Sequence, residues 1–111
     1  MINQLRIYEI FPDTRDAFHE RFCNHAARIM EDKYGFRISA MWETGTSEAP
    51  KFAYLLAWKD EDEMKGGWAD FMADEEWAGI KEQTAGSKMV GEIEEFVLHP
   101  TYYSIAIGAT G

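Results

Sequence analysis

The order of strand-like and helix-like apolar patterns constrains the fold of this chain more than any other feature. Apolar residues alternate over some stretches, as in half-buried strands, and recur every three or four residues over others, as in amphipathic helices. In order, the predicted elements are a strand at 5–10, a helix at 14–33, strands at 36–43 and 52–58, a helical stretch from residue 60, and a strand at 91–99. The order β-α-β-β-α-β is typical of ferredoxin-like α+β folds, with an antiparallel sheet and helices on one face.

The third predicted strand indicates that both faces of the sheet are covered. Apolar side chains occupy both of its sides, with Phe52, Tyr54, Leu56 and Trp58 on one and Ala53, Leu55 and Ala57 on the other. Strands that are apolar on both sides are usually buried on both sides. Because the helices cover one face only, we expect the open face to pack against a second copy of the chain, giving a homodimer.

The length of 111 residues predicts a single domain, 1–111, that is large enough to bury a core without disulfides. We place the core of this domain at about residues 3–100 and a tail at 101–111. The tail is uncharged and rich in β-forming residues, so it is either an arm on a neighbouring subunit or a frayed terminus. The arm hypothesis applies to residues 101–105.

The charge of the chain limits the partners that it can bind. Twenty acidic and eleven basic residues give a net charge of −9, which argues against binding to nucleic acid or to anionic membranes. Cys23 is the single cysteine, so no intramolecular disulfide can form. Neither a secretory leader pattern nor a run of roughly 20 apolar residues is present, and we expect a cytoplasmic protein.

Glycine and charged residues mark specific positions in the predicted elements. Gly35 is expected to end the first helix in a left-handed conformation, and Gly91 to mark a bulge in the last strand. The Gly66-Gly67 pair inside the second helix indicates either a close approach of the backbone to another group or a loose segment. Arg6 shares a strand face with Tyr8, and its expected partner is Glu92 or Glu94 on the last strand.

Aromatic residues make up 14% of the chain, which is high for one small domain. A ligand cavity, a subunit interface or an aromatic-rich core would each account for them. We expect Trp42, Tyr54 and Trp58 to project from the hairpin strands to the same side. Together with Trp68 or Trp77 they can line a flat apolar cavity, unless these rings fill the core completely.

The chain also resembles a known family over residues 3–103. The residues that carry the likeness are Leu5-Arg6-Ile7-Tyr8-Glu9-Ile10 followed by Pro12, Phe18, Gly35-Phe36, Trp42, Tyr54-Leu55-Leu56-Ala57-Trp58-Lys59-Asp60, Trp68, Phe71 and Asp74-Glu75-Glu76-Trp77. They resemble the NIPSNAP family, whose members are similar in fold to the dimeric α+β barrel superfamily. The resemblance implies a dimer with facing sheets, and a cleft between sheet and helices in which some relatives bind small molecules. It implies no agreed catalytic motif.

The resemblance also suggests which residues to consider for a site. Cofactor-free oxygenases in related barrels deprotonate their substrates with the help of a histidine or a tyrosine, and His25 and Tyr54 are the catalytic candidates here. The expected ligand-binding residues are the large rings of Tyr8, Trp42, Trp58, Trp68 and Trp77.

The sequence predicts no metal site and no cofactor. His19 and Cys23 are four residues apart on one helix face, but no third ligand is evident nearby. The chain has no phosphate-binding glycine loop, no Gly-x-Ser-x-Gly elbow and no Cys-x-x-Cys. Haem binding, known in some relatives, would require a histidine aimed into the cleft.

Two main hypotheses about function follow. The first is a homodimer that binds a small apolar or aromatic molecule, with a cofactor-free oxygenase or isomerase as its enzymatic form. It predicts a cleft of several hundred Å³ lined by at least one of His25, Tyr8, Tyr54 and Trp58. The second is a non-catalytic dimerisation or protein-interaction module, which predicts no cavity and an exposed apolar strip.

Overall fold

The computed structural model describes residues 1–105, so residues 106–111 of the expected tail lie outside the described part. The helices and strands are β1 (Ile2–Ile10), α1 (Arg15–Arg21), α2 (Ala27–Tyr34), β2 (Arg37–Gly45), β3 (Pro50–Trp58), α3 (Glu61–Met72), α4 (Glu75–Gln83) and β4 (Val90–Leu98). A 3₁₀ turn, Pro12–Thr14, precedes α1, and a π-helical turn, Phe22–Ala26, joins α1 to α2.

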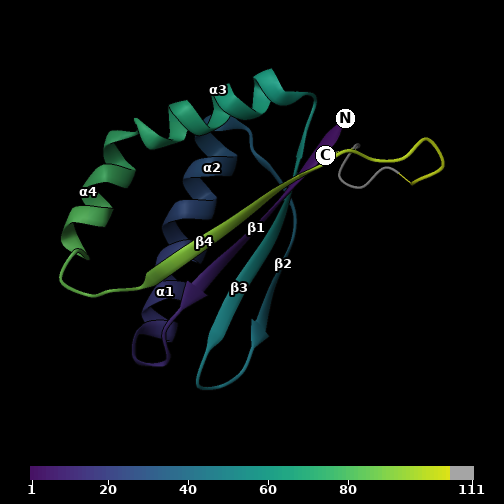
Figure 1. Cartoon of the computed structure of the whole chain (residues 1–111). Helices are drawn as coiled ribbons and strands as arrows, with labels where there is room; N and C mark the ends of the chain where they lie inside the picture. The colour runs from purple at the N-terminus through teal and green to yellow at the C-terminus, as the bar shows by residue number, and fades with distance from the viewer. Residues whose placement is uncertain (106–111) are drawn as a thin grey trace.

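The four strands form one antiparallel sheet in the order β2-β3-β1-β4. The helices lie on one face of this sheet (Figure 1). In that view α1 and α2 lie beside the strands, α3 crosses the top, and α4 lies at the left edge. The ferredoxin-like α+β fold with one-sided helical cover is therefore confirmed. None of the helices within residues 1–105 has both the length and the hydropathy that a membrane span requires.

The first helical segment differs from its prediction as one continuous helix. The π-helical turn interrupts it after Arg21, and such a turn contains one more residue than an α-helical turn. This change of phase allows apolar residues on both sides of the turn to face the sheet, and Phe18, Ala26 and Ile29 are all buried. Gly35 ends α2 with a φ of 68°, as predicted.

Aspartate side chains start the two later helices. The Asp60 carboxylate accepts a hydrogen bond from the backbone N–H of Glu63 at 2.8 Å, and Asp74 accepts one from that of Trp77 at 2.8 Å. Within α3, a Cβ atom on Gly67 would lie 2.8 Å from the Trp58 ring, whereas one on Gly66 would meet open space. Close packing against Trp58 therefore explains one glycine of the pair.

Bulges determine which side chains share a sheet face. The pairing of β2 with β3 shifts between Ile38 and Ala40, so Trp42 lies opposite Ala53. Because opposite residues in a ladder point to the same side, Trp42 lies on the open face, away from Tyr54. The expectation that these two side chains share a side was wrong, since it assumed unbroken alternation.

A second bulge lies in β4. Tyr8 pairs with Ile93 but Ile10 pairs with Val90, so β4 contains one extra residue beside Gly91, as predicted. Beyond β4 the chain runs away from the sheet (Figure 1), and the side chains of Tyr102 and Tyr103 are exposed. A role of residues 101–105 as an arm on another subunit stays a prediction.

The open face of the sheet is largely apolar. Its exposed or half-buried side chains include those of Leu5, Ile7, Trp42, Leu55, Phe96 and Leu98. Ala53 and Ala57 on the same face are buried within the single chain. The side chains between the helices and the other face form the core, in which Tyr54, Phe18, Ile10, Ile29, Met30, Leu56 and Gln4 are fully buried.

Candidate functional site

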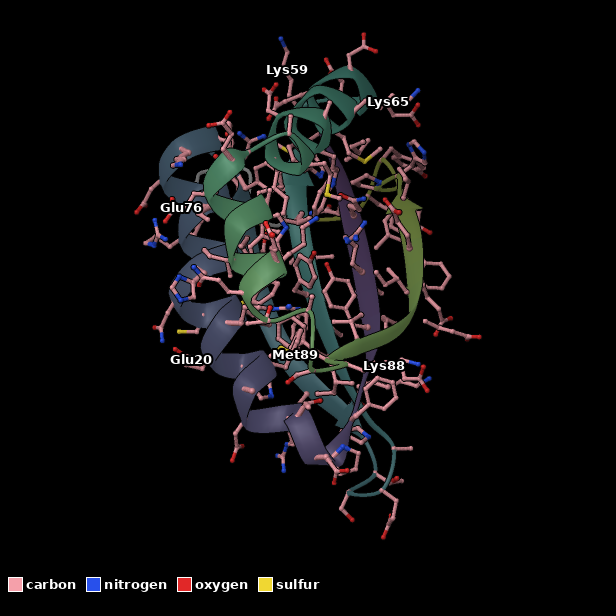
Figure 2. All side chains as sticks on the ribbon, turned by 90° about the vertical axis from the view of Figure 1, so that its left-hand side faces the viewer. Glu20, Lys59, Lys65, Glu76, Lys88 and Met89 are labelled. Carbon is pink, nitrogen blue, oxygen red and sulfur yellow. The ribbon has the colours of Figure 1, made fainter. Side chains whose placement is uncertain are left out.

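A cleft opens between the helical layer and strands β1 and β4, and we call it the helix–sheet cleft. Its volume is about 210 Å³. Aromatic side chains form a large part of its wall: Tyr8, Phe18, Phe22, Trp68, Phe71 and Trp77. Figure 2 looks across the layer of side chains between the helices and the sheet, with β4 at one side and α4 in front. The cleft is thus a partly closed apolar space.

Two tyrosines and an arginine meet beside this cleft. The hydroxyl oxygens of Tyr8 and Tyr54 are 2.6 Å apart, and Arg6 Nε donates to the Tyr54 hydroxyl at 3.0 Å. Tyr8 and Arg6 line the cleft, whereas Tyr54 is completely buried behind Tyr8. Burial raises the pKa of Tyr54 well above its usual value. The Tyr54 hydroxyl is therefore a neutral hydrogen-bonding group at neutral pH.

Arg6 is held in place from several directions. Its guanidinium lies over the Trp68 ring at 4.3 Å, and its Nη1 forms an ion pair with Glu95 at 3.2 Å. The expected partners, Glu92 and Glu94, were wrong because the strand register places Glu95 opposite Arg6. This network fixes the guanidinium beside the tyrosine hydroxyls.

The buried side chain of Gln4 links the sheet to α3. Its amide oxygen accepts hydrogen bonds from the indole N–H groups of Trp58 at 3.0 Å and Trp68 at 2.8 Å. Its amide nitrogen donates to Glu95, which also pairs with Arg6. Gln4 therefore fixes one wall of the cleft, although sequence analysis did not identify it. The available signal was a polar residue on the helix-facing side of a buried strand.

Two further cations line the cleft near Trp77. The Arg21 guanidinium and the Lys81 ammonium lie 5.4 Å and 5.9 Å from the centre of the Trp77 ring. Arg21 Nη1 also donates to the Thr84 hydroxyl at 2.9 Å. Neither cation was identified from the sequence, because α1 and α4 meet only in the folded chain.

The structure brings some of the sequence-predicted residues together and separates others. Tyr8, Trp68 and Trp77 line the helix–sheet cleft, while Trp58 lies behind Gln4. Trp42 belongs to the open face, as described above, and is removed from this cleft. His25, the other catalytic candidate, lies in the π-helical turn and is not part of the cleft lining; its Nδ1 atom is buried without a hydrogen-bond partner in the described structure.

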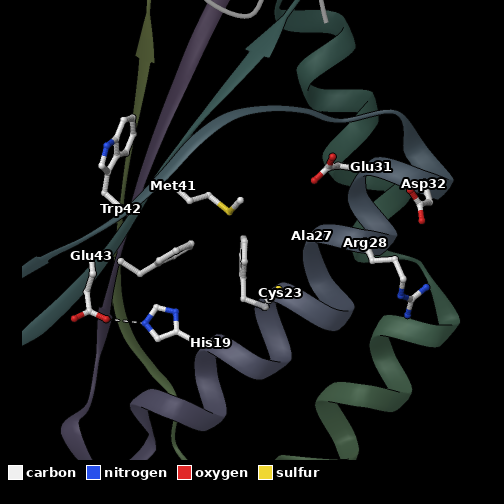
Figure 3. Close-up of a pocket in the computed structure, with 11 residues that line it drawn as sticks. His19, Cys23, Ala27, Arg28, Glu31, Asp32, Met41, Trp42 and Glu43 are labelled. Atoms are coloured by element: carbon white, nitrogen blue, oxygen red, sulfur yellow. Dashed lines mark hydrogen bonds and ion pairs between the residues drawn. The ribbon is translucent and has the colours of Figure 1, made fainter.

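A larger hollow of about 570 Å³ lies on the other side of the first helical segment, against β2. In Figure 3, Met41 points toward the helices and Trp42 points away from them. His19 Nε2 lies 2.7 Å from the Glu43 carboxylate, which also pairs with Arg15. No group of three metal-ligating side chains occurs in the described part of the chain. The lining of this hollow is more charged and less aromatic than that of the helix–sheet cleft.

Comparison with models of known protein families finds a match for this chain. The family model of NIPSNAP matches residues 3–105. The chain belongs to the NIPSNAP family. A search of curated proteins finds no match. The match covers nearly the whole of the described fold, and the NIPSNAP resemblance noted in the sequence is confirmed.

Solved NIPSNAP structures share this fold at low sequence identity. A NIPSNAP domain protein from Burkholderia xenovorans aligns with a TM-score of 0.79 at 16% identity, covering 96% of this chain and 100% of that one. A NIPSNAP family protein of unknown function from Agrobacterium tumefaciens aligns with a TM-score of 0.77 at 15% identity, covering 94% and 91%. These likenesses support the fold alone.

A more distant structure is that of SnoaB from Streptomyces nogalater, described as a cofactor-independent oxygenase. It aligns with a TM-score of 0.50 at 10% identity, covering 93% of this chain and 97% of that one. The NIPSNAP fold of this chain is thus similar in outline to that of an oxygenase.

Proposed function

We propose that this NIPSNAP protein is a homodimer that binds a small aromatic or apolar molecule in the helix–sheet cleft. The observation that carries the proposal is the convergence of Arg6 and two tyrosine hydroxyls beside an aromatic-walled space of about 210 Å³. Ligand sites are commonly apolar hollows with a few fixed polar groups. This cleft has both components.

The polar groups define how a ligand would be oriented. The Tyr8 hydroxyl and the Arg6 guanidinium border the cleft and suit an oxygen atom on the ligand, such as a carbonyl or phenol. Tyr54 does not border the space, but it holds the Tyr8 hydroxyl at 2.6 Å. The aromatic walls suit the ring of the ligand.

The enzymatic form of this proposal is a cofactor-free oxygenase or isomerase. The Arg6 guanidinium and the Tyr8 hydroxyl would stabilise the enolate oxygen of a ring substrate that binds in its ionised form. Because SnoaB, which is similar in fold, is described as a cofactor-independent oxygenase, oxygenation is the first reaction to test. Tyr54 is a positioning residue in this scheme, and a basic role for His25 would require access from outside the cleft lining.

Binding is tested with purified protein and a panel of small aromatic molecules, by native mass spectrometry and thermal shift. The variant Ile93→Trp fills the cleft from β4, and Val97→Trp is its matched control on the same strand face but outside the lining. We expect complexes with the wild type and with Val97→Trp, and none with Ile93→Trp. Absence of any complex, or equal binding by Ile93→Trp, would contradict the proposal.

The apolar open face favours a second candidate function, a non-catalytic interaction module. Trp42, Phe96 and Leu98 are exposed there in the single chain. If this face bound other proteins instead of a second copy, the purified chain would be a monomer with no small-molecule complex. The oligomeric state and the small-molecule binding of one purified sample therefore distinguish the two functions.

A further inference from the structure

The charged side chains that line the helix–sheet cleft are all cations, although the whole chain carries a net charge of −9. They are Arg6, Arg21 and Lys81, and no carboxylate within residues 1–105 belongs to the lining. The larger hollow, by contrast, is lined by three carboxylates and one arginine. The lining of this cleft is thus positively charged in a chain whose net charge is negative.

Two of the three cations have no carboxylate partner. Arg6 is paired with Glu95, but among the described residues neither Arg21 nor Lys81 forms an ion pair. Arg21 has the Thr84 hydroxyl and the Trp77 ring as its contacts. Burial lowers the pKa of Arg21, because its charge is partly removed from water. A partly buried cation of this kind is stabilised when an anion binds beside it.

The two unpaired cations lie next to an aromatic surface. Both are near the Trp77 ring, and that ring stacks on Phe71 with centroids 5.4 Å apart at 27°. A flat ligand packed against this wall would place a substituent beside Arg21 and Lys81. The guanidinium of an arginine matches a carboxylate through two parallel hydrogen bonds.

We propose that the ligand of the helix–sheet cleft is an aromatic or apolar acid whose carboxylate binds Arg21, with Lys81 as the second cation. This inference rests on the proposed function, since it presupposes that the cleft holds a ligand. The Arg6–tyrosine group then contacts a different part of the same molecule. Ligand orientation is thereby set from two ends of the cleft.

The inference is tested with two probes that differ in charge, 2-naphthoate and the uncharged 2-naphthamide. Binding of each to the full chain is measured by isothermal titration calorimetry at pH 7. We expect 2-naphthoate to bind roughly tenfold or more tightly than the amide, as is typical of a charge-assisted contact. Arg21→Gln should remove most of this preference, and Arg21→Lys should retain part of it.

The matched control is Arg15→Gln, which removes an arginine from the same helix but outside the cleft. It should keep the preference for 2-naphthoate. Circular dichroism checks folding, and if Arg21→Gln does not fold, Lys81→Gln takes its place with a smaller expected loss. An unchanged preference in the folded cleft variants, or an equal loss in Arg15→Gln, would overturn the inference.

The outcome also separates this inference from the proposal beneath it. Equal binding of the two probes would overturn the acid specificity and leave the proposed small-molecule function standing. Failure of both probes to bind would overturn the inference and count against the function as well.

Discussion

The hydroxyl oxygens of Tyr8 and Tyr54 lie 2.6 Å apart beneath the helices, and one of the two groups donates a hydrogen bond to the other. Tyr54 is completely buried, so its ring and hydroxyl are separated from water by Tyr8 and Arg6. The pair joins the core of the sheet to the lining of the helix–sheet cleft. The contribution of this pair to stability, and the ionisation of Tyr54, can be measured in the unliganded protein.

Tyr54→Phe should lower the free energy of unfolding by about 1 kcal/mol, because Tyr8 and Arg6 each lose a hydrogen-bond partner. Since burial raises the pKa of Tyr54, its ionisation should be the step at highest pH in a titration of tyrosine absorbance. The variant should lack that step. Tyr102→Phe, which changes an exposed tyrosine, should retain it. Retention of the step in Tyr54→Phe would show that the phenol is not shielded.

Gln4→Leu should be strongly destabilising, by about 2–4 kcal/mol, since two indole N–H groups lose their acceptor inside the protein. Urea denaturation measures this change. Gln83→Leu makes the same substitution at an exposed position near the end of α4 and should change stability little. A small effect of Gln4→Leu would mean that the Trp58 and Trp68 indoles find other partners.

The two adjacent glycines of α3 should respond in opposite directions to alanine. Gly66→Ala should raise the free energy of unfolding by roughly 0.5–1 kcal/mol, because a Cβ there meets open space and alanine favours the helix. Gly67→Ala should lower it by about 1–3 kcal/mol, since its Cβ would overlap the Trp58 ring. Thermal unfolding of the two variants side by side is the measurement, and equal shifts would refute this packing.

Protonation of Asp74 at low pH should lower the free energy of unfolding. The Tyr34 hydroxyl, the Trp77 backbone N–H and Lys33 lower the pKa of Asp74 to about 2. An unfolded aspartate has a pKa of about 3.9, so this stabilisation is complete above about pH 4 and is lost as the pH falls through 2. Asp74→Asn should flatten that part of the stability profile.

The matched control for Asp74 is Asp13→Asn, which neutralises an exposed aspartate in the turn before α1. Chemical denaturation between pH 5 and pH 2 should show the acid-sensitive decline in this variant as in the wild type. An identical decline in Asp74→Asn would assign the sensitivity to other carboxylates.

The proposed homodimer predicts opposite behaviour for two neighbouring residues of β4. Phe96→Glu places a charge on the open face and should yield monomers in light scattering after size exclusion. Val97→Glu places the same charge on the other side of the strand, outside the open face, and should remain dimeric. A monomeric wild type at micromolar concentration would contradict the dimer itself.

Local patterns in the sequence predicted the elements of this fold well. Alternation and helical spacing located the strands and helices, and the position of Gly35 at the end of α2 is confirmed because it depends on near neighbours in the chain. One-sided helical cover followed from the order of elements. These features need no knowledge of which strands pair in which register.

The candidate site was less predictable because it depends on register and on contacts between distant segments. Because the pairing of β2 with β3 shifts by one residue, Trp42 lies on the open face. The register of β4 against β1 places Glu95, and not Glu92 or Glu94, opposite Arg6. Arg21 and Lys81 come together only because α1 and α4 both pack around Trp77. Periodicity within one segment carries no information about contacts between segments that are distant in the sequence.

One carboxamide serving two indoles also constrains how this protein can change over evolutionary time. Replacement of Gln4 by an apolar residue would leave both indole N–H groups without an acceptor. A stable homologue with such a replacement should therefore also differ at Trp58 and Trp68. Positions 4, 58 and 68 should therefore covary as a trio among related sequences, even though they belong to three different segments of the chain.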